Sequence, residues 1–270
     1  MDGMTSGGVV VKLGGSVVTD KRAEEPRVRR EVVSRLAREI ADAAPRPLVL
    51  VHGAGSFGHQ IVRRTRLHEG LQGPRSLLDW GETQRLQYDL DSEVAGLMLA
   101  EGLPVVPCQA SATAVMRAGT LVSMDLGAVR LMVERGAVPL LYGVPAVDLD
   151  QGCSILSGDQ IAPYVASGLG IDRLVHATDV DGVFEEDPGL SPAAQRFDRI
   201  DAASWPEVRR RLGGSKAIDV TGGMAGKVEA LLNAARGGLE VRIVDANVPG
   251  RLASALRGEA VGTLVLWGHP

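Results

Sequence analysis

Aromatic residues are scarce in this sequence. They make up 3% of its 270 residues, which argues against a surface of stacked rings for single-stranded nucleic acid. The formal net charge of −4 gives no broad attraction to nucleic acid or to anionic lipid. Any anionic ligand must therefore be held locally, by a small number of residues.

Cysteines and long apolar runs are also lacking. Cys108 and Cys153 are the only cysteines, too few for a disulfide framework and without metal-site spacing, so both are interpreted as buried thiols. Residues 1–8 lack a basic segment followed by an apolar one, and no stretch approaches the roughly 18 uninterrupted apolar residues of a membrane span. We expect a cytoplasmic protein without membrane or nucleic-acid partners.

Apolar strands alternate with amphipathic helices along the chain. Strands are predicted at 9–13, 48–51, 104–107, 137–142, 173–177, 241–244 and 262–266, and helices at 31–43, 82–100, 126–135, 160–168 and 227–236. This alternation predicts an α/β fold in which a mostly parallel sheet has helices on both faces, a three-layer αβα sandwich. Residues 188–201, rich in Pro, Ser and charge, predict a mobile loop.

The segment from His52 to His59 contains a literal GxGxxG after a predicted strand. In a dinucleotide-binding protein this fingerprint opens a helix that leads to a second strand, with an acid about 20 residues further on. Here several arginines and the turn-prone Gly70–Pro74 follow instead, which argues against a dinucleotide. The segment Gly222–Val228 is not a P-loop, because Thr221 replaces its first glycine and Val228 its Ser/Thr.

What remains is a set of glycine turns at strand ends, where backbone N–H groups can bind an anion. Lys12, Lys21 and Lys227 lie near these turns in sequence. A single glycine pair is more often only a tight turn. Two such loops early in the chain, Lys12–Ser16 and Gly53–His59, predict two phosphate groups held for direct transfer.

Four motifs occur in an order that resembles the amino acid kinase family: KLGGS at 12–16, SGD at 157–159, TDVDGV at 178–183, and TGGM at 221–224 with Lys227. Within this family, segments 12–21, 52–59, 152–159 and 219–224 look like the isopentenyl phosphate kinases, whose hallmark histidine is matched by His59. Fosfomycin kinases are similar in having one. The resemblance implies ATP-dependent phosphorylation of isopentenyl phosphate, with Mg²⁺, by a homodimer. It also implies one domain over 1–270, with an acceptor part over about 1–170 and a nucleotide part over about 171–270.

The resemblance also implies roles for single residues. Lys12 and Lys227 contact the phosphates, Asp159 orients these lysines, and His59 donates a hydrogen bond to the acceptor's phosphate. The implied acceptor-binding residues are Gly14, Gly15, Ser16, Gly53, Ala54, Gly55, Gly58, His59, Ile155 and Gly158. The implied ATP-binding residues are Lys12, Gly14, Thr178, Asp179, Gly182, Val183, Gly222, Gly223, Met224 and Lys227.

Three assignments stay open on the residues alone. Lys21 either reaches the transferred phosphate or is a solvated loop lysine, whereas His52 is interpreted as structural. No protein ligand to Mg²⁺ is predicted, because nucleotide phosphates and water usually hold this ion. An apolar acceptor tail needs a cavity, which the helix over 82–100 and Ile155 could supply if their side chains are not simply core.

One position departs from the family pattern. The family usually has Tyr-Gly-Asp where this chain has Tyr142-Gly143-Val144. Either an acid near the acceptor is missing, or Asp148 replaces it. Two other functions therefore remain: a kinase of another small phosphate or phosphonate, and a non-catalytic nucleotide sensor of the same fold. A dinucleotide-dependent oxidoreductase is the third alternative.

Overall fold

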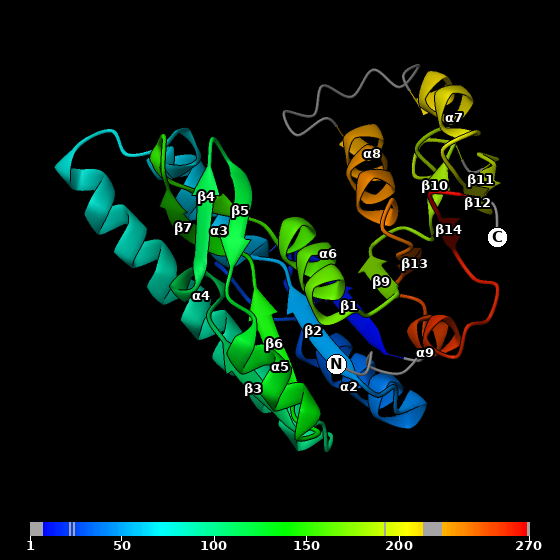
Figure 1. Ribbon diagram of the computed structural model, residues 1–270, viewed down its shortest axis with the longest axis horizontal. Coiled ribbons are helices and arrows are strands. Elements are labelled where there is room, and N and C mark those ends of the chain that lie inside the picture. The colour runs from blue at the N-terminus through cyan, green and yellow to red at the C-terminus, as the bar shows by residue number, and fades with distance from the viewer. Residues whose placement is uncertain (1–7, 22, 24, 192, 213–222, 269–270) are drawn as a thin grey trace.

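The computed structural model describes residues 8–268 except 22, 24, 192 and 213–222. Its centre is an eight-stranded sheet in the order β12-β14-β13-β9-β1-β2-β6-β3 (Figure 1). The strands are β1 (Val9–Leu13), β2 (Leu48–His52), β3 (Val105–Cys108), β6 (Val138–Tyr142), β9 (Arg173–Thr178), β12 (Arg199–Ile200), β13 (Glu240–Asp245) and β14 (Thr263–Val265). The run from β13 to β3 is parallel, and β14 is antiparallel to β13.

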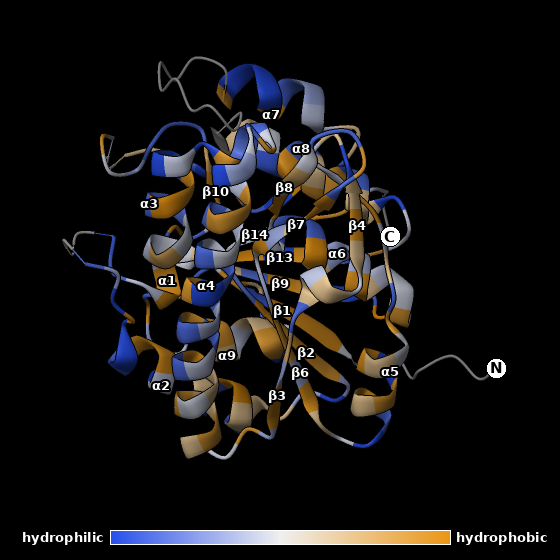
Figure 2. Cartoon of the chain, turned by 90° about the vertical axis from the view of Figure 1, so that its left-hand side faces the viewer, coloured by the Kyte–Doolittle hydropathy of each residue, from blue (hydrophilic) through white to orange (hydrophobic). Residues whose placement is uncertain are grey.

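Helices cover both faces of this sheet. One face carries α1 (Gly15–Val18), α2 (Arg30–Ala43), α3 (Gly55–Thr65), α4 (Pro74–Ala100) and α9 (Arg251–Leu256), and the other α5 (Gly127–Glu134), α6 (Gly158–Leu169), α7 (Trp205–Leu212) and α8 (Gly223–Ala235). Residues of β1 alternate between two core clusters: Val9 and Val11 pack with the first set, and Val10 with the second. Figure 2 shows the apolar strands enclosed between helices with polar outer surfaces. The predicted three-layer α/β fold is confirmed.

A second, four-stranded sheet lies beside α4 (Figure 1). Its order is β5-β4-β7-β8, built from β4 (Ala114–Arg117), β5 (Thr120–Met124), β7 (Val144–Asp148) and β8 (Gly152–Leu156). These strands are not predictable from the sequence, because they are short and their polar and apolar residues do not alternate regularly. A small hairpin of β10 (Val183–Phe184) and β11 (Arg196–Phe197) completes the strands of the described chain.

Three local expectations need correction. The glycine loop after β2 does open a helix, α3, so the absence of a helix is not the reason to reject a dinucleotide site; α3 leads into α4 rather than to a strand. Helix α4 begins at Pro74, not at residue 82, because a proline fits the first helical position, where its missing N–H costs no bond. Within the expected loop 188–201, residues 196–197 and 199–200 form strands. Among the described residues, no helix is long and apolar enough to cross a membrane.

Asp148 is a buried structural carboxylate at the end of β7. It is 2% exposed and accepts hydrogen bonds from the backbone N–H groups of residues 118, 119, 150 and 151 and from the Ser154 hydroxyl, at 2.8–3.1 Å. Burial acts to raise the pKa of Asp148, but these donors, beginning with the Gly119 N–H, outweigh it and hold the pKa well below its usual range. With its oxygens committed to the second sheet, Asp148 does not replace the acid missing at Val144.

We expect Asp148→Asn to lower the free energy of unfolding by about 2–4 kcal/mol, because an amide presents a donor to groups that are all donors. The stabilisation by the ionised side chain is complete above the unfolded pKa of about 3.9 and is lost as the pH falls through this value toward the folded pKa. Urea unfolding at a series of pH values measures this. A gap between wild type and variant that stays constant down to pH 3 would contradict the assigned role.

Candidate active site

The two glycine loops meet where the neighbouring parallel strands β1 and β2 end. The Gly53 N–H donates to the Leu13 carbonyl at 2.9 Å, and the Gly14 N–H donates to Ala177 at the end of β9 at 2.8 Å. A Cβ atom on Gly15 would lie 2.6 Å from the Gly55 nitrogen, and one on Gly53 would lie 2.6 Å from the Gly15 nitrogen. Only glycine allows the two backbones to approach this closely, so the predicted pair of loops forms one continuous surface.

Thr19 fastens the second loop to the first. Its hydroxyl donates to the Gly15 carbonyl at 2.7 Å and accepts from the Ser56 N–H at 2.9 Å. Gly55, with φ of +51°, leaves no room for a side chain because a Cβ atom would lie 2.2 Å from the Thr19 hydroxyl oxygen. Ala54 has φ of −68°, so this departure from a middle glycine introduces no backbone strain. The N-terminus of α3, an eleven-residue helix, therefore faces the junction with its positive dipole end.

Lys12 lies beneath this junction as a buried cation. It is 6% exposed, and its Nζ lies 2.9 Å from Asp159 Oδ1 at the start of α6. The same carboxylate oxygen lies 2.8 Å from His176 Nε2. Burial acts to raise the pKa of Asp159, but Lys12 and then His176 outweigh it and hold this pKa well below its usual range. Asp159 is thus an anion that pairs with the lysine, and its role in orienting the lysines for catalysis stays a prediction.

Lys227 extends this positive site from α8. Burial, and then the charge of Lys12, lowers the pKa of Lys227, whereas Asp159 and Asp179 act in the opposite direction. The charges of Lys12 on β1 and Asp159 on α6 therefore influence the pKa of Lys227 on α8. A pair of ammonium groups, one buried and one half-buried, is stabilised by an anion placed between them.

Lys21 crosses from the first loop to the end of β9. Its Nζ lies 3.1 Å from Asp179 Oδ2, and both side chains are exposed, by 65% and 42%. Asp181, two residues further along the chain, forms ion pairs with two arginines: Arg196 and Arg251 lie 2.8 and 3.1 Å from its Oδ2. Among the described residues, no group of three or more His, Cys, Asp or Glu side chains could hold a metal ion.

The two histidines of the second loop have different surroundings. His59 lies exposed in α3, and partial desolvation, followed by the charges of Lys21, Arg63 and Lys12, lowers its pKa below 6.5. His52 is fully buried, stacks on Tyr142 with ring centroids 5.5 Å apart, and has Nε2 3.1 Å from Asp91 Oδ1. Only His59 is therefore available to a ligand.

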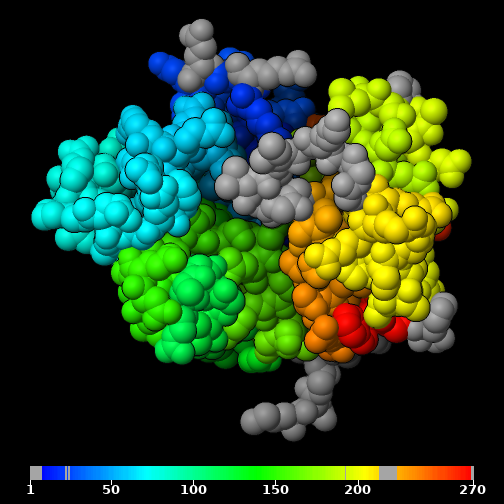
Figure 3. All heavy atoms as spheres, turned by 90° about the horizontal axis from the view of Figure 1, so that it is seen from above, coloured from blue at the N-terminus to red at the C-terminus, as the bar shows by residue number. Residues whose placement is uncertain are grey.

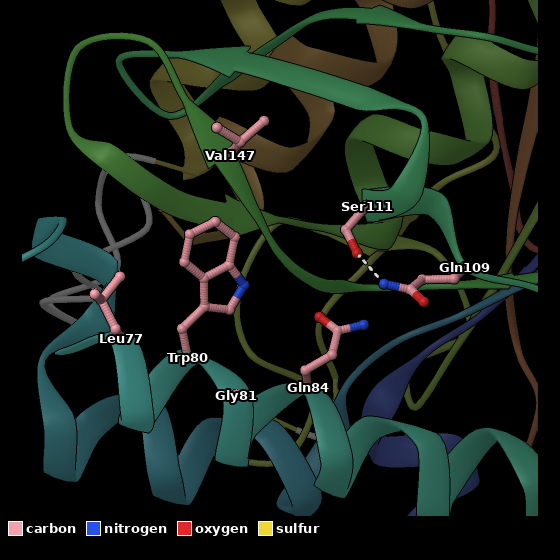
Figure 4. A pocket seen from close by; sticks show the side chains of 7 residues that line it. All are labelled: Leu77, Trp80, Gly81, Gln84, Gln109, Ser111 and Val147. Carbon is pink, nitrogen blue, oxygen red and sulfur yellow. Dashed lines mark hydrogen bonds between the residues drawn. The ribbon is translucent and has the colours of Figure 1, made fainter. Parts of the chain in front are cut away.

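A polar stripe on α4, formed by Gln84 and Gln87, runs behind the second loop and is not predicted from the sequence. Gln87 is fully buried, and neither atom of its amide has a hydrogen-bond partner among the described residues. A Cβ atom on Gly58 would lie 2.9 Å from Gln87 Nε2. One helical turn toward the N-terminus, Gln84 lines a cavity of about 350 Å³ (Figure 4). Its other lining residues are Leu77, Trp80, Gly81, Gln109, Ser111 and Val147. Glutamines at helical spacing among buried positions are the sequence signal that could have revealed this stripe.

The remaining predicted site residues occupy these same elements. Gly158 begins α6, where a Cβ atom would lie 3.5 Å from Lys12 Cε, and Ile155 is half-buried in β8.

Thr178 is buried, Val183 donates its N–H to the Thr263 hydroxyl at 2.8 Å, and Gly182 needs its φ of +111°. Ser16 is half-buried, Gly223 begins α8, and Met224 packs against the core. Gly222 lies outside the described residues.

Comparison with known proteins agrees with this architecture. The sequence profile of the amino acid kinase family matches residues 8–245. The chain belongs to the amino acid kinase family. Members of this family that are similar along nearly the whole chain include the isopentenyl phosphate kinase of Methanothermobacter thermautotrophicus, 38% identical over 97% of this chain and 100% of that protein. The isopentenyl phosphate kinase of Methanocaldococcus jannaschii is 31% identical over 94% of this chain and 96% of that protein.

A solved structure supports the same placement within the family. An X-ray structure of isopentenyl phosphate kinase superposes with a TM-score of 0.83 at 35% identity, covering 96% of this chain and 99% of that one. The match spans nearly the whole length of both chains. The resemblance inferred from four short motifs is thereby confirmed.

Proposed function

We propose that this chain transfers the γ-phosphoryl group of ATP to isopentenyl phosphate, giving isopentenyl diphosphate and ADP. The observation that carries the proposal is the junction of the two glycine loops, with Lys12 beneath it and His59 on its open side. The similarity of the whole chain to isopentenyl phosphate kinases supports the same acceptor. In this proposal a phosphorylated acceptor binds at α3 and the nucleotide at α8 and the end of β9.

The chemistry requires no general base from the protein. A phosphomonoester has a second pKa near 6, so at pH 7 its attacking oxygen is largely ionised. That oxygen forms the new bond to the γ-phosphorus while the bond from this phosphorus to the β–γ bridging oxygen breaks. Lys12 and Lys227 offset the mutual repulsion of the two anions and the charge that develops on the leaving oxygen.

Mg²⁺ fits this site as an ion bound by nucleotide phosphates and water, where it would supply further positive charge. The described residues supply no carboxylate cluster for it, because Asp159 binds Lys12 and His176, and Asp181 binds two arginines. We infer that the lysines contribute most of the protein's own positive charge at the reaction centre.

On the acceptor side, the Ser56 N–H donates to Thr19, so the other N–H groups at the start of α3 and the His59 ring bind the phosphate. The Ser56 hydroxyl and the Gln87 amide, both buried without partners among the residues described, add unused hydrogen-bonding capacity next to this loop. Ile155 and the cavity at Trp80 accommodate the acceptor's tail. Burial, followed by the charges of Lys21, Arg63 and Lys12, lowers the pKa of His59 and favours the neutral ring in the unliganded site, which can bind the phosphate through an N–H hydrogen bond.

The arrangement of the chain supports separate parts for binding the acceptor and the nucleotide. Figure 3 shows chain segments from the first half and from the last third on opposite sides of one face. We infer an acceptor part over about 1–170 and a nucleotide part over about 171–270 within one domain. The homodimer stays an implication of the family resemblance, and the cytoplasmic location stays a prediction from the sequence.

Phosphate-acceptor preference tests the proposal directly. We expect a coupled ADP-release assay to give a kcat/KM for isopentenyl phosphate at least about 100-fold above that for fosfomycin or UMP. Preference for another acceptor would overturn isopentenyl phosphate as the substrate but would leave the proposed kinase activity in place. ATP binding in a thermal-shift titration without turnover of any acceptor would favour the nucleotide sensor, and stabilisation by NAD(P) alone would favour the oxidoreductase.

A further inference from the structure

His176 is a buried polar residue that none of the recognised motifs includes. It lies in the middle of β9 and is 1% exposed. In the register of the sheet it is paired with Lys12 on β1 and with Ile243 on β13. Side chains paired across parallel strands point to the same face, so His176 and Lys12 lie side by side beneath α6. Both bind a single atom, Asp159 Oδ1, at 2.8 and 2.9 Å.

The hydrogen bonds define the protonation of the ring. Nε2 faces a carboxylate and must carry a proton, whereas Nδ1 is buried without a partner in the described part of the chain. Burial, and then the charge of Lys12, lowers the pKa of His176 to about 4, so the ring is neutral at pH 7. His176 therefore donates one hydrogen bond to Asp159 without adding a third positive charge beside Lys12 and Lys227.

We propose that His176 is a positioning residue for phosphotransfer, whose Nε2–H holds the Asp159 carboxylate in the orientation that aims Lys12 at the transferring group. A carboxylate with one donor can rotate about its side-chain bonds and carry the lysine with it. Two donors on adjacent strands of fixed register remove this freedom. Because catalysis here depends on the placement of cations, a small misdirection of Lys12 lowers turnover more than binding. This inference rests on the proposed kinase function.

The test compares His176→Phe, which keeps the size of the ring but removes the donor, with His176→Gln, which keeps an N–H at a similar reach. We expect His176→Phe to lower kcat with isopentenyl phosphate by about 10- to 100-fold, the range for loss of a hydrogen bond to a charged group. KM for both substrates should change by less than about threefold, since uniform binding is retained. His176→Gln should recover most of the lost kcat. Unchanged kcat in His176→Phe would overturn the proposal.

A double-mutant cycle shows whether the effect passes through Asp159. In an Asp159→Asn background, His176→Phe should cause little further loss, whereas additive losses would contradict a shared pathway. Nitrogen-15 NMR of the wild-type imidazole rings gives a readout that needs no turnover. We expect the Nε2–H tautomer for His176, and the Nδ1–H tautomer would overturn the contact even if His176→Phe failed to fold. An inactive wild type with the Nε2–H tautomer would count against the kinase function alone.

Discussion

A Lys12→Met variant is expected to turn over at about one thousandth of the wild-type rate, a loss of about 4 kcal/mol of transition-state stabilisation. The ammonium group lies beneath the junction of the two glycine loops and is fixed by Asp159 at 2.9 Å. Methionine keeps the aliphatic stem of a side chain that is only 6% exposed, so the surrounding packing is retained. Steady-state kinetics with ATP and isopentenyl phosphate give kcat and both KM values.

Arg242→Met provides a matched control for loss of a cation from the same sheet. Arg242 lies on β13 and donates to the Val261 carbonyl at 3.0 Å, outside the loop junction. Its replacement should leave kcat nearly unchanged, although it removes a half-buried hydrogen bond. If Lys12→Met retained more than about a tenth of the wild-type kcat with a native unfolding curve, Lys12 would not be the principal cation of the reaction.

His59→Ala is expected to lower kcat/KM for isopentenyl phosphate by about 10²- to 10³-fold, the usual effect of removing one donor from a transferring or attacking anion. KM for ATP should change little, because His59 lies on α3, on the acceptor side of the junction. The folded state should persist, since the ring is exposed and packs against no core cluster of the described residues. The assay varies each substrate in turn with the other saturating.

His68→Ala is the matched control, because His68 is also an exposed histidine but lies in η1 (Leu67–Glu69), beyond the end of α3. It should behave as wild type. Restoration of activity in His59→Gln would indicate that the N–H donor matters rather than the ring. A His59→Ala enzyme with near-normal kcat/KM and an unchanged melting curve would remove His59 from the site.

The predictable parts of the molecule are those that depend on local patterns. The strands that became β1 and β2 are continuous apolar runs followed by glycines, and Lys12, Asp159 and Lys227 belong to motifs with fixed spacing. Helix α3 was not predicted because its first turn contains Gly55 and Gly58, which have low helix propensity; here Thr19 and the packing against the first loop override that preference.

The unpredicted parts depend on contacts between distant segments. His176 follows an apolar stretch and is typical of a core histidine until the sheet places it beside Lys12, 164 positions earlier in the chain. Gln87 likewise occupies an ordinary helical position until α3 packs across it. Neither residue stands in a recognisable motif, so only the tertiary structure brings them to the site. Asp148 shows the converse. Its position in the sequence made it a candidate for the missing acid near the acceptor, but its oxygens accept hydrogen bonds within the second sheet.

The cation cluster also makes the site chemically distinctive. Among the 29 basic residues other than histidine, the only lysines are Lys12, Lys21, Lys216 and Lys227; every other one is an arginine. Acylating reagents attack neutral primary amines and leave guanidinium groups unmodified at ordinary pH. Burial, followed by the charge of Lys12, lowers the pKa of Lys227, which favours the neutral, nucleophilic amine at this position. Apart from the amino terminus and Lys216, which lies outside the described residues, covalent amine probes therefore address the proposed catalytic centre and almost nothing else on the protein.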